Sequence, residues 1–323
     1  MTPHVGFRFV ERAICIPLLA VMCSAQAWVP PKGEGELSVI YQNLYTRDHF
    51  NGDGNRFDAG RIRLEGLVQA VDFGVTDKLA VSTSVPVFAG KYQGLFPHKY
   101  PIDDGNYHGS LQNFGFGARY MAVERPLVLT PFVGFTMPIW NYEHFAHSAI
   151  GTSMWEVGLG FNAARRLDPV LPNAYFQLRY TYVITQEILG IRPNKNRIDA
   201  EFGYFLTPRL AVRALAGSQV TLTGLDFPND FPSRTNTLWH HHDQISAVNY
   251  LNLGGGVSFA VTNSLDLFAT MATSVWGQNG HALNTGLSLG ASWSFHMPWA
   301  RPPMGFQDSA HWKMKPNEMK PCH

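Results

Sequence analysis

Apolar side chains recur at every second position from residue 35 to residue 295, which is the period of a β-strand and not of a helix. In GLSLGASWSF, residues 286–295, the residues Leu, Leu, Ala, Trp and Phe alternate with Ser and Gly. The pattern predicts twelve strands in one domain, 28–295. They lie near 36–46, 61–71, 79–87, 113–120, 127–140, 155–163, 176–184, 197–205, 210–223, 248–261, 265–276 and 286–295.

The connections between these segments alternate in length. Five are short and turn-like, at 74–78, 124–126, 167–173, 207–209 and 262–264. Six are longer, at about 47–58, 89–109, 141–153, 187–197, 224–247 and 277–284. Short turns on one rim and long loops on the other are typical of an outer-membrane barrel, whose turns face the periplasm. We therefore predict an all-β fold: a transmembrane up-and-down antiparallel β-barrel of about 12 strands.

The charged positions indicate which face lines the barrel. A soluble barrel or sandwich would hide its apolar face inside, whereas a membrane barrel turns that face to lipid and points polar residues into the bore. The membrane interpretation is favoured because aromatic residues lie near strand ends, as in Tyr41/Tyr45, Trp140/Tyr142, Trp155, Trp276 and Trp293/Phe295. It predicts these pore-lining residues: Arg61, Arg63, Glu65, Arg119, Glu156, Arg179, Asp199, Glu201 and Arg213.

The N-terminus resembles an export signal. Arg8 and Arg12 precede an apolar stretch, 13–23, and the small residues before Trp28 fit a cleavage site, so residues 1–27 are expected to form a signal peptide. A lipoprotein attached through Cys23 is the alternative. No later stretch reaches the ~20 apolar residues of a membrane helix. We therefore expect the protein in the bacterial outer membrane, without a helical anchor.

The segment after the last strand, 296–323, has no period, and we expect a Pro/Met/His-containing periplasmic tail there. Its methionines and Cys322 supply the thioether and thiolate groups that Cu(I) prefers, with histidines beside them. A flexible extension explains the same composition. Cys322 would be the single cysteine left after signal cleavage, which allows no intramolecular disulfide.

The overall charge argues against one class of partner. With 25 Lys and Arg against 24 Asp and Glu, we expect no nucleic acid. The expected partners are outer-membrane lipid, the outer-membrane assembly machinery and a small-molecule solute. No CxxCH motif is present, and the G-x-S-x-G match GLSLG, residues 286–290, lies within a predicted strand and not at the strand-to-helix turn of a nucleophile elbow. We therefore assign no cofactor and no catalytic residue, and we do not expect an enzyme.

Two segments resemble a known family. VDFGVTDKLAVSTSVPVF, residues 71–88, is similar to a recurring strand–turn–strand unit of the outer-membrane transporters named for the meta-pathway of phenol degradation. GYFLTPRLAVRA, residues 203–214, resembles a second copy of that unit. The alternating strand that ends in Phe295 also resembles the assembly signal of outer-membrane barrels, although 28 residues follow it. The resemblance implies a barrel and the passage of small organic compounds.

Histidines concentrate in the predicted external loops. Nine of the thirteen lie there: His49, His98, His108, His144, His147, His240, His241, His242 and His281. The spacings in EHFAH and HHHD suit a transition metal. The candidate zinc or copper ligands are His144, His147, His240, His241 and His242. Alternatively, the loop histidines are solvated or paired with Asp103, Asp104 and Asp243.

The sequence thus favours an outer-membrane channel or transporter for small organic solutes, acting by passive or facilitated diffusion. The long loop 224–247 is expected to fold over or into the mouth of the barrel. The alternative is a structural or metal-binding surface protein that uses the loop histidines.

Overall fold

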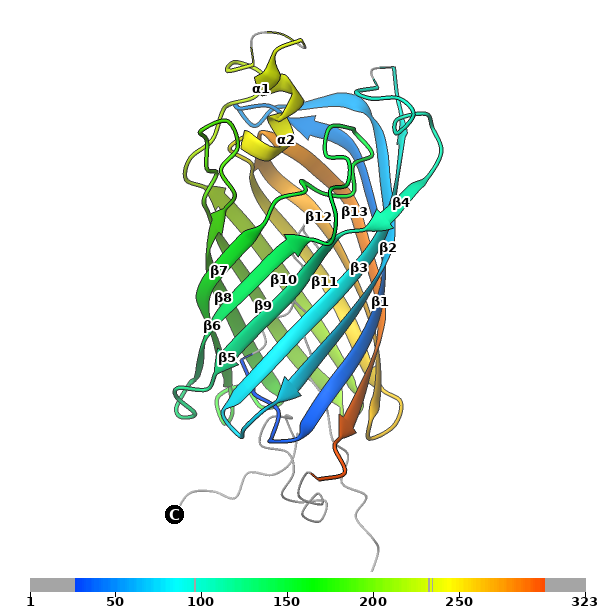
Figure 1. The fold of residues 1–323 in the computed structure, drawn as a ribbon. Helices are drawn as coiled ribbons and strands as arrows, with labels where there is room; N and C mark the ends of the chain where they lie inside the picture. The colour runs from blue at the N-terminus through cyan, green and yellow to red at the C-terminus, as the bar shows by residue number, and fades with distance from the viewer. Residues whose placement is uncertain (1–26, 96, 232, 234, 300–323) are drawn as a thin grey trace, which may run out of the picture.

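The computed structural model describes residues 27–299, apart from residues 96, 232 and 234. These residues form a closed barrel of antiparallel strands, with short turns at one end and long loops at the other (Figure 1). Nearly all of the expected signal peptide and most of the expected tail lie outside the described residues.

Thirteen stretches of strand build the wall in the described part of the chain. They are β1 (Glu34–Phe50), β2 (Arg56–Gly74), β3 (Leu79–Gln93), β4 (His108–Leu111), β5 (Asn113–Tyr120), β6 (Val128–Pro138), β7 (Glu156–Arg166), β8 (Ala174–Thr185), β9 (Lys195–Thr207), β10 (Leu210–Thr221), β11 (Asn249–Ala260), β12 (Leu265–Gln278) and β13 (Gly280–His296). Two helical turns, α1 (Thr237–His240) and α2 (His242–Ile245), lie in the longest loop. No described helix is long and apolar enough to cross a membrane.

The ring closes where β1 pairs with β13, from Glu34 opposite His296 to Phe50 opposite Gly280. β4 and β5 both pair with β3, so they act as one strand that is interrupted at Gln112. The wall therefore consists of twelve strands, and the predicted up-and-down barrel is confirmed. Closure pairs the backbone groups of every strand, which is what a hydrocarbon environment demands.

The short connections lie together at one rim as predicted, but two of the predicted long loops are wrong. The connection expected at 47–58 shrinks to 51–55, and the one expected at 277–284 shrinks to Asn279, between β12 and β13. These strands extend past the rest of the wall: β2 has 19 residues, against 11 for β7. A strand outside the membrane needs no apolar face, so its sequence loses the alternation and resembles a loop.

The outer face of the wall carries an apolar belt. Leu67 and Met271, which a water-soluble fold would bury, are 47% and 61% exposed. Exposed tryptophans lie at both borders, with Trp276 near the loop rim and Trp293 near the turn rim. Tyr142 is the exception among the predicted border aromatics, because it is buried inside the barrel. This exterior suits lipid, and the protein is a β-barrel of the bacterial outer membrane.

Gly203 on β9 faces Tyr175 on β8, and this pair tests how tightly the inner face is packed. The Tyr175 ring is fully buried, and a methyl group at position 203 would overlap it. Gly203→Ala should therefore lower the free energy of unfolding by about 1–3 kcal/mol through overpacking. Gly134→Ala on β6 is the matched control, because its nearest contact would lie 3.9 Å away. Urea titration followed by tryptophan fluorescence measures the difference, and equal midpoints would contradict tight packing.

Candidate functional site in the barrel interior

Six of the nine predicted pore-lining residues lie on the inner face of the wall. Each alternates along its strand with outward apolar residues, as Arg119 does with the exposed Tyr120. The six are Arg119, Glu156, Arg179, Asp199, Glu201 and Arg213.

The other three, Arg61, Arg63 and Glu65, point away from the bore, so this part of the prediction is wrong. On β2 the side chains of Ile62 and Leu64 are buried inside the barrel, which turns the odd-numbered positions outward. The alternation along β2 is as predicted, but the face predicted to point into the bore points outward. Upper β2 rises above the apolar belt, where the outer face meets a polar environment and the inner face packs on a loop.

The inward charges pair across the wall. Arg119 on β5 reaches past β3 and donates hydrogen bonds to both carboxylate oxygens of Asp72 on β2, at 2.6 and 2.7 Å. Arg213 on β10 lies 3.7 Å from the Glu201 carboxylate on β9. All four side chains are more than nine-tenths buried, where an unpaired charge would be strongly destabilising.

A second network of charges joins β7, β8 and β9. Glu156 on β7 forms ion pairs with Lys195 at 2.7 Å and Arg197 at 3.2 Å, both on β9. Asp199, two residues further along β9, interacts electrostatically with Arg179 on β8 and with Arg197. Lys195 and Arg197 are missed at the sequence level, because Lys195 lies in the loop predicted at 187–197 and Arg197 lies where that loop meets the predicted strand 197–205. The alternation of inward and outward side chains extends from Asp199 towards the N-terminus of β9, and this pattern identifies Arg197 and Lys195 as inward residues.

Two of the inward glycines, Gly160 and Gly290, do not leave this space open. The ring of Phe132 lies beside Gly160, where a methyl group would come within 3.1 Å of it. The Arg179 guanidinium stacks on the same ring, 3.8 Å from its centroid. Phe268 covers Gly290 in a similar way, and a side chain at that glycine would overlap the ring. Aromatic rings therefore fill the room that these glycines provide.

Towards the loop rim, the inner face of β1, β2 and β3 carries an apolar cluster instead, whereas nearer the turn rim the same face holds Glu36 and Asp72. In the ring of twelve strands, this face lies across the bore from the charged strands β8, β9 and β10 (Figure 1). The apolar cluster consists of Ile40, Leu44, Ile62, Leu64, Val68, Phe88 and Tyr92, with Leu283 of β13. The upper bore thus has an apolar side and a charged side.

The connection 139–155, called the inner loop, packs against the apolar side. Tyr142 joins the apolar cluster, and its hydroxyl donates a hydrogen bond to Asn113 Oδ1 at 2.7 Å. Gly90 on β3 lets the backbone at Ser148 approach the wall, because any side chain at position 90 would overlap the Ser148 carbonyl. The loop therefore occupies the upper bore and does not project into solvent.

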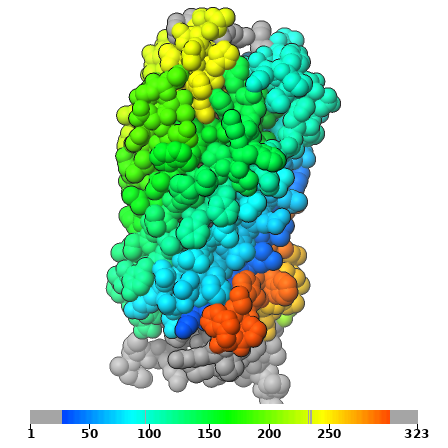
Figure 2. Space-filling model, in the orientation of Figure 1, coloured from blue at the N-terminus to red at the C-terminus, as the bar shows by residue number. Residues whose placement is uncertain are grey.

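The connection 222–248, called the lid, covers the external mouth, and its yellow part rises above the wall (Figure 2). Its apolar residues form a core of their own. On one side Gln244 donates a hydrogen bond to the carbonyl of Thr152 in the inner loop, at 2.7 Å. On another side the Phe227 N–H donates to Asn279 Oδ1 at 2.7 Å. The expectation that this loop folds over the mouth is confirmed.

Asp103 in the connection 94–107 ties two of these loops together. Its carboxylate accepts hydrogen bonds from the backbone N–H groups of His98, His147 and Ser148, at 2.8, 3.1 and 3.0 Å. The Ser148 hydroxyl donates a fourth bond at 2.7 Å. Burial raises the pKa of this carboxyl, but the bonds from Ser148 and the backbone outweigh burial and hold the pKa below its usual range.

Five histidines gather beneath the lid. The rings of His98 and His147 stack with their centroids 3.6 Å apart. His242 meets His98 edge-on at 5.1 Å. His49 and His281, from the ends of β1 and β13, lie 4.3 Å apart and continue the cluster through His147.

The candidate metal ligands do not share one site. His147 and His242 belong to the buried cluster, whereas His144 stacks on His241 at 5.2 Å and His240 packs on an aromatic ring. Among the described residues, no three His, Cys, Asp or Glu side chains are placed to hold one ion.

The alternative interpretation, in which loop histidines pair with aspartates, is seen three times in the described chain. His108 contacts Asp104 at 2.8 Å, and His242 and His281 contact Asp243 at 3.4 and 3.9 Å.

At the turn rim, residues 27–31 enter the bore and are called the N-terminal segment. The Ala27 carbonyl accepts a hydrogen bond from Thr130 Oγ1 at 2.5 Å. The Trp28 carbonyl accepts one from Arg119 at 3.1 Å, so the ion pair with Asp72 also anchors this segment. Segments of the chain itself therefore occupy both ends of the bore.

No family model and no curated protein matches this chain. Among solved structures, an outer membrane channel from Pseudomonas putida F1 is similar over 83% of this chain and 98% of that chain, with a TM-score of 0.64 and 14% identity. The NanC porin is similar over 81% of this chain and 100% of that chain, with a TM-score of 0.45 and 11% identity. The β-domain of the Bordetella autotransporter BrkA is similar over 82% of this chain and 100% of that chain, with a TM-score of 0.47 and 14% identity. At 14% identity, the likeness to the Pseudomonas putida channel shows the fold alone. The resemblance to the phenol-pathway family and the recognition by assembly machinery stay predictions.

Glu156 holds two buried cations, so its removal should be strongly destabilising. Glu156→Gln leaves Lys195 and Arg197 without their carboxylate, and we expect a loss of about 3–5 kcal/mol in the free energy of unfolding. Glu156→Gln combined with Lys195→Gln should recover part of the loss, because one uncompensated charge is removed. Urea unfolding of the refolded variants measures both effects. An unchanged single variant, or a double variant no better than the single, would refute the pairing.

Acid should loosen the lid. Burial and the neighbouring His147 lower the pKa of His98 to about 3, against about 6.5 in an unfolded chain. Between pH 3 and pH 6.5 the opened state therefore binds more protons at His98 than the closed state does. The stability of the closed loops falls as the pH drops from about 6.5 towards 3. Hydrogen exchange of 222–248, corrected for intrinsic rates, should be faster at pH 5 than at pH 7. His98→Phe keeps a ring without a titrating proton and should weaken the difference in exchange between pH 5 and pH 7. Equal protection of the wild-type lid at both pH values would contradict the coupling between His98 and the lid.

Proposed function

We propose that this protein is an outer-membrane channel or transporter that passes small organic solutes by passive or facilitated diffusion. The observation that carries the proposal is the two-sided upper bore, in which the apolar cluster on β1–β3 lies opposite the charged face of β8–β10. A solute with an apolar body and a polar group finds complementary surfaces on the two sides. The alternative of a metal-binding surface protein has no comparable support, because no three donor groups converge in the described residues.

Passage requires the inner loop as well as the two end closures to move, and the architecture allows this. The lid and the N-terminal segment lie outside the closed ring of strand pairing. Each is held by hydrogen bonds, such as Gln244 to Thr152 above and Arg119 to Trp28 below, and by packing of apolar side chains on its surroundings. Either segment therefore moves without breaking the wall that seals the barrel from lipid.

The balance of charge favours selection by size and shape. On the inner face each carboxylate of the ion pairs lies beside a cation, as with Asp72 and Arg119 or Glu201 and Arg213. A mixed-sign lining gives no strong barrier to either anions or cations, unlike a ring of one sign. We therefore expect small neutral and weakly charged organic molecules to pass.

Loosening the lower closure should increase solute flux. The Trp28 ring packs on the buried cluster of Tyr175 and Phe205 inside the turn rim, so Trp28→Gly removes the largest side chain of the N-terminal segment. We expect liposomes that contain Trp28→Gly to release a small aromatic acid several-fold faster than wild-type liposomes. Trp299→Gly is the matched control, because Trp299 is 61% exposed.

Protein-free liposomes set the baseline for this assay. If the wild type, Trp28→Gly and a variant without the lid all release sugars and aromatic acids at the baseline rate, and planar bilayers show no conductance steps, the channel proposal fails.

A further inference from the structure

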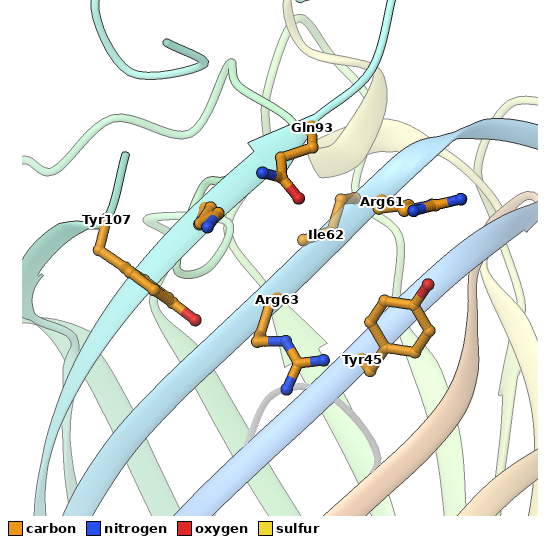
Figure 3. Close-up of a pocket in the computed structure, with 7 residues that line it drawn as sticks. Tyr45, Arg61, Ile62, Arg63, Gln93 and Tyr107 are labelled. Carbon is orange, nitrogen blue, oxygen red and sulfur yellow. The ribbon is translucent and has the colours of Figure 1, made fainter. Parts of the chain in front are cut away.

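A cationic pocket of about 190 Å³ lies on the outside of the barrel near the loop rim (Figure 3). Its lining comes from β1, β2, β3 and the segment that precedes β4: Tyr45, Arg61, Ile62, Arg63, Lys91, Gln93 and Tyr107. The channel proposal leaves this pocket without a role, because its charged side chains point away from the bore.

The pocket lies directly above the apolar belt. Leu67 on β2 and Val87 on β3 are register partners, and they are 47% and 41% exposed on the outer face. Four residues further towards the loop rim on each strand, the outward partners are Arg63 and Lys91. Four residues of a tilted strand correspond to a rise of about 10 Å. The cations therefore lie at the level of the lipid headgroups in the external leaflet.

The positive charge of the pocket is only partly balanced by the protein. Arg63 and Lys91 are direct cross-strand partners, an arrangement that is repulsive unless an anion lies beside them. Arg61 is the next outward residue on β2. Of the carboxylates in the described chain, none forms an ion pair with these three cations. A nearby carboxylate, Glu65, accepts hydrogen bonds from two neutral side chains, Asn43 and Tyr107.

Neutral and aromatic groups hold the cations in place. Arg63 donates a hydrogen bond to Asn43 Oδ1 at 3.2 Å, and its guanidinium lies 5.2 Å from the centroid of the Tyr45 ring. The Lys91 ammonium lies 5.3 Å from the centroid of the Tyr107 ring. These contacts use only part of the donor capacity of each cation, so the remaining N–H groups are available to a ligand that approaches from the membrane side.

We propose that this pocket binds a phosphate group of an outer-leaflet lipid headgroup, as carried by the phosphorylated sugars of lipopolysaccharide. Phosphate offers several acceptor oxygens that match the donors of arginine and lysine. Basic clusters at the membrane surface bind anionic headgroups. The position above Leu67 and Val87 favours a lipid over a soluble anion, because the acyl chains of the same molecule cover that apolar surface. A bound phosphate also relieves the repulsion between Arg63 and Lys91.

Titration of the purified full chain, in zwitterionic detergent, with fluorescently labelled lipopolysaccharide tests the proposal. The test variant replaces the three pocket cations: Arg61→Gln, Arg63→Gln and Lys91→Gln. It should bind about 100-fold more weakly than the wild type. The control variant removes three exposed cations at the turn rim: Lys78→Gln, Arg125→Gln and Arg165→Gln. It should bind like the wild type, and heat-modifiable mobility on gels shows whether each variant is folded.

Two further ligands separate the possible sources of the phosphate. Dephosphorylated lipopolysaccharide should bind the wild type as weakly as the test variant binds the phosphorylated form. Inorganic phosphate should not displace the labelled lipid when the two are present at equal concentration. A folded test variant that binds like the wild type would overturn the proposal, and so would displacement by equimolar inorganic phosphate, which indicates a site for soluble anions. Solute flux through the bore is independent of both results.

Discussion

The closed ring of backbone hydrogen bonds is the constraint on which the rest of this structure depends. Hydrocarbon offers no partner for a free N–H or C=O group, so a sheet in a membrane is stable only without edges. Here the first and last strands meet along their whole length, from Glu34 opposite His296 to Phe50 opposite Gly280. Because the wall is complete by itself, the segments at its two ends are free to serve as closures.

Closure also creates an interior that must neutralise its own charges. Inside the wall the surroundings are poor in water, and an isolated charge would be strongly destabilising. The inward ions are therefore paired, as Arg119 is with Asp72 and Glu156 with Lys195. On the other side of the upper bore the lining carries an apolar cluster, which is partly covered by the inner loop. One ring of strands thus carries two chemically different sides, and this contrast is the basis of the proposed passage of small organic solutes.

The upper parts of β1, β2 and β3 connect the interior with the exterior. Above the apolar belt their outer face meets headgroups and water, whereas their inner face remains in contact with the inner loop. The same stretch of β2 therefore places Leu64 in a buried cluster and Arg63 in the outer cationic pocket. A sequence rule in which apolar residues face lipid holds within the belt and reverses above it, because the solvent changes along the strand.

The sequence by itself determined the number and order of the strands, the rim of short turns and the lipid-facing belt, because a period of two and turn-forming residues are local properties of the chain. It also determined that charges of both signs, such as Arg213 and Glu201, would share the inner face. The tertiary structure alone decided that Arg63 faces outward, that β12 turns into β13 at Asn279, and that His98 and His147 stack beneath the lid. These features depend on the height of a residue relative to the membrane and on contacts between segments far apart in the chain, and no local pattern carries that information.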